Sequence, residues 1–116
     1  MPIDTKQFLA VLRAILSESA VIRARACDEA TDWVDGWSGR QAGAVVSVSL
    51  WLAEGESDFD ALEAELHAAS ELVENCEVDR RDIQGVRAID RNRLPESMIE
   101  YYDYLVSMLD GDEKPS

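Results

Sequence analysis

The chain has few of the residues that usually carry catalysis or cross-links. Its 116 residues include one histidine, two cysteines and three prolines. His67 has no second histidine beside it for a paired acid–base mechanism. Cys27 and Cys76 stand far apart, which predicts neither a disulfide framework nor a zinc knuckle but two buried, reduced thiols. Phosphate-binding glycine loops, nucleophile elbows and zinc-protease motifs are also missing. The sequence therefore indicates no catalytic residues, no metal and no cofactor.

Long apolar runs and a basic leader are lacking as well. The first residues, Met1-Pro2-Ile3-Asp4, have neither the basic nor the apolar region of a signal peptide. The longest apolar run, 42–53, is interrupted by Gly43, Ser47 and Ser49 and is too short to cross a bilayer. We therefore expect a cytoplasmic protein.

Basic residues are scarce. Eleven Lys and Arg stand against 24 Asp and Glu, which gives a formal net charge of -13. Phosphate groups would be repelled by this charge, so we expect neither direct nucleic-acid binding nor attachment to a membrane surface. With 47% hydrophobic and 30% charged residues, the composition is that of a globular protein, and the length suits one domain.

The first third of the chain has the periodicity of a helix. Asp4 and Gln7 have the spacing of a capping box. Inward positions then recur every three or four residues, with Phe8, Leu12, Ile15, Ile22, Ala26, Ala30, Trp33 and Trp37 in one phase. One helix over 4–35, roughly 48 Å long at 1.5 Å per residue, and two helices broken at Ser17-Glu18-Ser19 fit this pattern equally well. Gly36 is the expected residue just beyond its end.

Residues 42–53 fit two kinds of secondary structure. Val46, Val48, Leu50 and Leu52 alternate with polar residues or Trp51 as in a strand, whereas Ala42, Val45, Ser49 and Ala53 have helical spacing. A lone strand has no partner for its backbone hydrogen bonds, so we predict a central helix from Arg40 to Glu54.

The second half predicts three further helices. Gly55 ends the preceding helix and Ser57 caps the next, whose inward positions are Phe59, Leu62, Leu66, Ala69, Val73 and Cys76. A shorter helix is expected from Asp79 to about Ile89, and a last one from Pro95 to Gly111. The prediction is thus an all-α, four- to five-helix, bundle-like single domain over 1–116, with a disordered tail at about 112–116.

A block of carboxylates is the strongest functional signal. From Glu54 to Asp79 there is no Lys or Arg, while acidic residues stand at Glu54, Glu56, Asp58, Asp60, Glu63, Glu65, Glu71, Glu74, Glu77 and Asp79. Five arginines between Arg80 and Arg93 follow, for which we expect pairing with Glu74, Glu77 or the acidic helix. Because such a block weakens the fold by self-repulsion, it indicates either solubilisation or attraction of a basic partner.

Aromatic residues near these acids are candidate anchors. Tyr101 and Tyr104 share a helix face flanked by Glu100 and Asp103, and Trp51 lies off the apolar stripe. The predicted partner-binding residues are Glu54, Glu56, Asp58, Asp60, Glu63, Glu71, Glu74, Trp51, Glu100, Tyr101, Asp103 and Tyr104.

These features favour a non-enzymatic acidic protein that engages and blocks the basic surface of a protein partner. That partner would be a toxin or a nucleic-acid-binding enzyme such as a nuclease, and the acidic protein would act as an inhibitor or DNA mimic. Small immunity proteins that neutralise nuclease toxins have the same general style, although no family motif assigns residues here.

Two alternatives belong to other classes of protein. One is a structural or regulatory homodimer whose first helix and tryptophans form the interface. The other is a small metal-dependent enzyme with Glu63, His67 and Glu71 around the metal, since these residues share one helix strip.

Overall fold

A computed structural model describes residues 2–111, and all regular structure among them is helical. Its α-helices are α1 (Thr5–Ile15), α2 (Ala20–Asp32), α3 (Gly39–Gly55), α4 (Phe59–Asn75) and α5 (Glu96–Asp110), with the 3-10 segments η1 (Val34–Gly36), η2 (Arg80–Ala88) and η3 (Arg91–Arg93). The all-α prediction is confirmed. The tail expected at about 112–116 lies outside the described residues.

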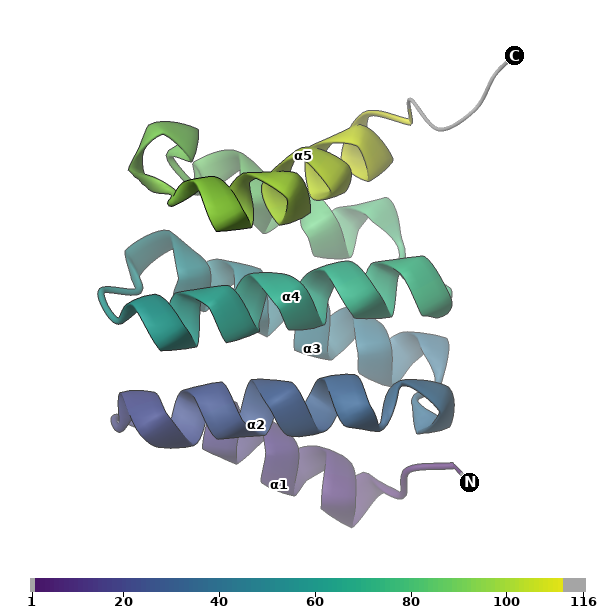
Figure 1. Cartoon of the computed structure of the whole chain (residues 1–116). Helices are drawn as coiled ribbons and strands as arrows, with labels where there is room; N and C mark the ends of the chain where they lie inside the picture. Colours follow the sequence, from purple (N-terminus) through teal and green to yellow (C-terminus); the bar gives the residue numbers. More distant parts are fainter. Residues whose placement is uncertain (1, 112–116) are drawn as a thin grey trace.

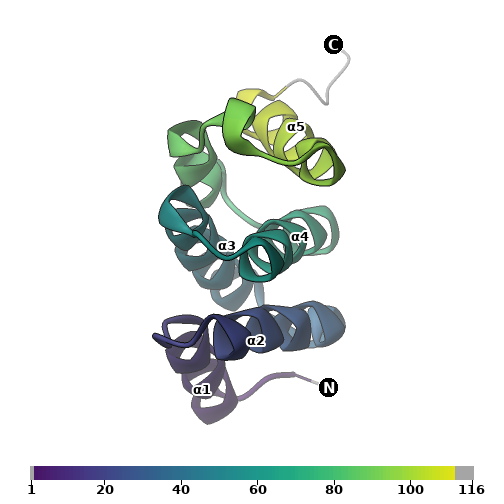
Figure 2. The same ribbon diagram turned by 60° about the vertical axis from the view of Figure 1, so that its left-hand side comes forward.

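The helices form two layers of a flat slab that measures 39 × 33 × 19 Å. Figures 1 and 2 show α2, α4 and α5 side by side in one layer, with α1, α3 and η2 behind them. Consecutive helices pair as α1–α2, α3–α4 and η2–α5, and the three pairs stack as the units of helical-repeat proteins do. The α3–α4 pair lies in the middle and packs against both others.

Residues 4–35 form two helices, not one. Asp4 and Gln7 make the expected capping box of α1, and Ser19 caps α2 by accepting a hydrogen bond from the Ile22 amide at 3.3 Å. An unbroken helix of this length would exceed the longest dimension of the molecule, so the break lets α2 fold back along α1. The break also places Ile22 at the surface, where 42% of it is exposed, although we predicted it to face inward.

The ambiguous segment 42–53 is helical, as predicted, and lies within α3 at the centre of the back layer. Ser38 and Gln41 form its capping box. The preceding turn differs from the expectation, because Gly36 lies in η1 and does not end a helix in the left-handed conformation.

Helix α4 is the most enclosed element of the fold. It lies between α2 and α5 and against α3, and its buried residues include Leu62, Leu66, Ala69 and Val73, as predicted. Two expectations about its ends are wrong. Asp58, not Ser57, provides the N-cap, and Phe59 is 66% exposed because α4 begins at the edge of the slab.

The last third contains less α-helix than predicted. Residues 80–88 form the 3-10 segment η2, and Asp79 makes no side-chain cap there. Gly85 lets η2 approach α3 closely, since a Cβ on it would lie 3.2 Å from the Leu50 Cβ. Helix α5 ends at Gly111, whose φ of 75° is left-handed, as a C-cap glycine requires. None of the helices in the described part combines the length and apolar character needed to span a bilayer.

Leu66→Ala is expected to lower the free energy of unfolding by about 2–5 kcal/mol, because it leaves a cavity in the middle of the core. The matched control is Leu9→Ala, which removes the same atoms from a side chain that is 44% exposed and should change stability by about 0.5 kcal/mol or less. Urea denaturation of both variants measures the difference. Equal losses would show that the α4 stripe is not the core.

Candidate functional site: the acidic strip of helix α4

Burial confines the carboxylates of α4 to one narrow strip. The positions of α4 that stay at least partly open to solvent after its first residue are Asp60, Glu63, His67, Glu71, Glu74 and Asn75. The first five follow one another at intervals of three or four residues and therefore lie on one face. The strip of Asp60, Glu63, His67, Glu71 and Glu74, called the acidic strip below, runs between α2 and α5 in the front layer.

A cleft opens beside the first half of the acidic strip. It has a volume of about 370 Å³ and is lined by Ala24, Asp28, Asp60, Glu63, Ala64, His67 and Tyr101. Three carboxylates from two helices thus face one cavity, and no Lys or Arg is among the lining residues. Sequence periodicity on α4 alone does not reveal Asp28, because only packing of α2 against α4 brings it there.

An aromatic pair forms one wall of this cleft. The rings of His67 and Tyr101 lie 5.3 Å apart, with 36° between their planes. The imidazole Nε2 of His67 is 3.8 Å from the Glu71 carboxylate. Burial raises the pKa of Tyr101, and the charges of Glu63, Glu100 and Glu71 raise it further. The phenol is therefore held neutral as a hydrogen-bond donor amid carboxylates.

Tyr104 extends the same surface along α5. Burial raises its pKa, followed by the charges of Glu74 and Glu71. Both tyrosines pack against the core, and carboxylates of the strip act on both phenols. The structure thus brings together seven of the predicted residues: Asp60, Glu63, Glu71, Glu74, Glu100, Tyr101 and Tyr104.

Other predicted site residues lie elsewhere. Trp51 and Glu54 are exposed at the end of α3, and Asp58 is occupied as the N-cap of α4. The Asp103 carboxylate pairs with Arg91 through two hydrogen bonds of 3.0 Å, which lower its pKa. Asp103 is thus not a free negative charge on this surface.

The arginines after Arg80 pair mainly with α5, not with α4 as predicted. Arg87 binds Asp110 at 2.6 Å and Arg91 binds Asp103, while Arg81 lies 3.5 Å from Asp79. Stacking of η2 and η3 against α5 explains this choice, since it brings these side chains to the α5 carboxylates. Within residues 2–111, no ion pair joins them to the acidic strip, whose charge stays uncompensated on that side.

Glu56 and Glu65, two members of the acidic block, are buried, which corrects the expectation that they present charge to solvent. Arg23 of α2 donates two hydrogen bonds of 2.8 Å to the Glu56 carboxylate and one of 2.9 Å to the Ser17 carbonyl. The Asp58 amide also donates to Glu56, at 3.1 Å. Arg23 and Glu56 thus tie the α1–α2 turn to the α3–α4 turn.

Glu65 lies behind this ion pair and is fully buried. Its Oε2 is 4.0 Å from the Arg23 Nε, and neither carboxyl oxygen has a hydrogen-bond partner in the described part of the chain. Burial, followed by the nearby Glu56, raises the pKa of Glu65 to about 9. For Glu56, burial acts in the same direction, but the hydrogen bonds from its neighbours prevail and lower its pKa to about 2. At neutral pH the cluster holds one neutral acid and one ion pair.

Sequence position gave a usable signal for Glu65. On the α4 helix, Glu65 projects between Leu62 and Leu72, on the side that carries the buried apolar residues. Helical periodicity alone therefore predicts that Glu65 faces inward. The many other carboxylates of the acidic block obscure this signal in the sequence.

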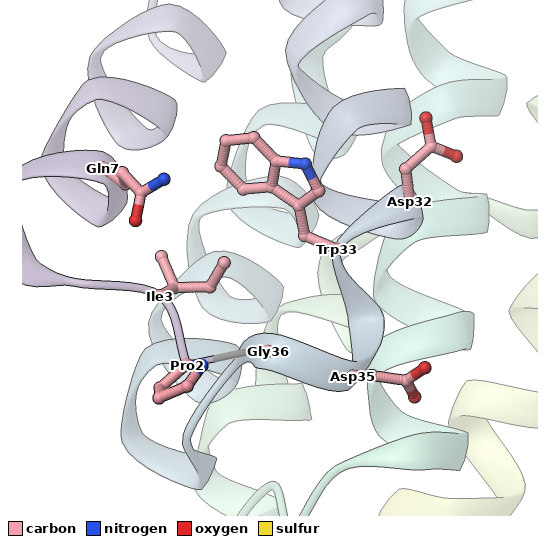
Figure 3. A pocket seen from close by; sticks show the side chains of 7 residues that line it. All are labelled: Pro2, Ile3, Gln7, Asp32, Trp33, Asp35 and Gly36. Atoms are coloured by element: carbon pink, nitrogen blue, oxygen red, sulfur yellow. The ribbon is translucent and has the colours of Figure 1, made fainter.

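A separate hollow lies where the N-terminal segment meets η1. Figure 3 shows the Trp33 indole facing Ile3, while the carboxylates of Asp32 and Asp35 point away from the ring. The hollow has a volume of about 330 Å³ and is held by a hydrogen bond of 3.0 Å from the Ile3 amide to the Gly36 carbonyl. It offers apolar contact without a converging set of polar groups.

A metal centre is not formed among residues 2–111, where no three His, Cys, Asp or Glu side chains are arranged to hold an ion. Glu63, His67 and Glu71 do not form such a group in this structure. Comparisons with protein-family models, with curated proteins and with solved structures found no match to the chain. The proposal for function accordingly depends on the site itself.

Glu65→Gln is expected to flatten the pH dependence of stability. Between pH 4.5 and about 9 the native state holds one proton on Glu65 that the unfolded chain has released, so stability falls as pH rises, by up to about 1.4 kcal/mol per unit. A neutral glutamine removes this slope. Urea denaturation at pH 5, 7 and 8.5 measures it, with Glu63→Gln on the exposed strip as control. An unchanged slope in Glu65→Gln would mean that Glu65 is ionised in the fold.

The two cysteines should differ in reactivity. Cys27 is fully buried, and burial raises its pKa to about 12. Cys76 is only half-buried at the end of α4, contrary to our prediction. Because thiolates react and opening of a helix end is easier than global unfolding, native-state thiol titration should label Cys76 first. The variants Cys27→Ala and Cys76→Ala identify the order, and earlier labelling of Cys27 would contradict it.

Proposed function

We propose that the protein is a non-enzymatic binding protein that engages a basic surface of a protein partner and blocks it. The observation that carries the proposal is the acidic strip, which continues into a cleft lined by Asp28, Asp60 and Glu63 with no Lys or Arg among its lining residues. Negative charge gathered in a concave, partly desolvated site attracts cations more strongly than the same charge spread over a convex surface.

The cleft suits an arginine or lysine side chain of the partner. Its volume of about 370 Å³ accommodates such a group, and the His67–Tyr101 pair offers an aromatic wall. A guanidinium against an aromatic face gains cation–π attraction, and its N–H groups find carboxylate acceptors on the opposite sides. Tyr104 and Glu74 extend the contact along the same groove.

The strip blocks its partner because it imitates the phosphate backbone that the partner binds. A row of carboxylates along a helix presents successive negative charges, as a nucleic-acid backbone does, and competes for a basic cleft that binds phosphates. A toxin nuclease or another nucleic-acid-binding protein therefore fits as partner, and electrostatic steering would make the association fast at low ionic strength.

Replacement of Glu63, Glu71 and Glu74 by glutamine tests the strip. The probe is a fluorescently labelled octa-arginine peptide, followed by anisotropy between 50 and 200 mM salt, which are concentrations chosen to vary screening. We expect the dissociation constant to rise at least about tenfold at the lower salt, because three charges at the site are lost while shape and helix propensity are kept.

The matched control is the variant Glu29→Gln, Glu77→Gln and Glu96→Gln, which removes three exposed charges from positions off the strip. Net charge is then the same in both triple variants, so any difference reports the location of the charges. Equal weakening in both would show that the peptide responds to overall charge alone, and the strip would lose its role.

A further inference from the structure

The exposed large hydrophobic residues gather in two parts of the chain. Among residues 2–111 they are Leu9, Leu16, Val21 and Ile22 in the first helix pair, and Trp51 and Phe59 around the α3–α4 turn. Single exposed apolar side chains are normal on protein surfaces. Exposed apolar side chains that gather in two places, one beside positive and one beside negative charge, indicate an interface.

Leu9 and Leu16 of the first group accompany positive charge. Helix α1 is the only α-helix with more basic than acidic residues. Lys6, Leu9, Arg13 and Leu16 follow at intervals of three and four and form one outward face, on which Leu16 is 53% exposed. Neither Lys6 nor Arg13 has an ion-pair partner in the described structure.

The second group accompanies negative charge. Trp51 is 69% exposed, and Glu54, one helical turn further along α3, is exposed beside it. The strip on α4 does not include this pair, and the proposed function leaves it unexplained.

One hollow lies between the α1–α2 turn and the α3–α4 turn. It has a volume of about 490 Å³, and its walls include Ser17, which directly follows Leu16, together with Trp51 and Glu54 from α3. The buried Arg23–Glu56 ion pair forms its floor and fixes the two turns relative to each other. The acidic, aromatic residues Trp51 and Glu54 thus line this hollow, and the basic, apolar residues Arg13 and Leu16 precede its Ser17 wall, at the end of the molecule where both turns lie (Figure 1, left).

We propose that this end is the interface of a two-fold dimer of this chain. A two-fold axis through the hollow places Arg13–Leu16 of one copy against Trp51–Glu54 of the other, and the reverse, so each contact occurs twice. Leu16 then covers the exposed indole of the second copy, and Arg13 pairs with Glu54. A second copy is the occupant because this one chain carries both complementary edges. The contacts lie off the acidic strip, so the dimer does not depend on the proposed function.

Sedimentation velocity over a concentration series tests the dimer. The wild-type chain should form a closed dimer at about 0.15 M salt, where screening limits the repulsion between two copies of charge -13. Trp51→Ala should raise the dimer dissociation constant by about tenfold or more, because exposed tryptophans at interfaces are frequent binding hot spots. A wild-type chain that remains monomeric at millimolar concentration would overturn the proposal.

Charge-reversal variants test whether Arg13 of one copy pairs with Glu54 of the other. Arg13→Glu and Glu54→Arg should each weaken self-association, since each places like charges opposite one another twice. Mixing the two variants, or combining both changes in one chain, should restore the dimer, because every contact then joins opposite charges again. Arg40→Glu, the same charge change at an exposed site distant from the hollow, is the control. Failure of the mixture to associate while the wild-type chain dimerises would overturn the two-fold pairing.

Discussion

Enclosure of α4 is the constraint on which the rest of the structure depends. This helix carries most of the acidic block, yet it lies between α2 and α5 and against α3. Its leucines and alanines must leave water on almost every side, so only one line of positions stays available for charge. The acidic strip is therefore narrow because the helix is central, and the neighbouring helices form the walls of the cleft beside it.

The same enclosure forces two carboxylates into the interior. Glu56 remains charged because Arg23 donates two hydrogen bonds to its carboxylate, whereas Glu65 remains neutral because burial and the nearby Glu56 disfavour its ionised form. Removal of one partner of a buried ion pair destabilises the fold by more than the net contribution of the pair, because the other charge is left buried and unpaired. Its structural role is to hold the first helix pair to the central one at the two turns.

Two surfaces with separate chemistry result. The acidic strip and the tyrosines of α5 form an acidic groove on the front layer, while the end near Trp51 carries both signs of charge beside exposed apolar side chains. The arginines of η2 and η3 do not neutralise the groove, because stacking directs them to Asp103 and Asp110 of α5. The pairing of the helices thus determines which carboxylates remain without an arginine partner within the described structure.

The sequence by itself determined the helical class, the capping box at Asp4, the helical state of 42–53 and the strip of Glu63, His67, Glu71 and Glu74. These follow from periodicity and capping, which act within a few residues along the chain. Only the tertiary structure decided the break after Ile15, the Arg23–Glu56 pair, the exposure of Phe59 and the meeting of Asp28 with Tyr101. Each depends on which helices become neighbours, and that choice is set by the packing of the whole core rather than by any local pattern.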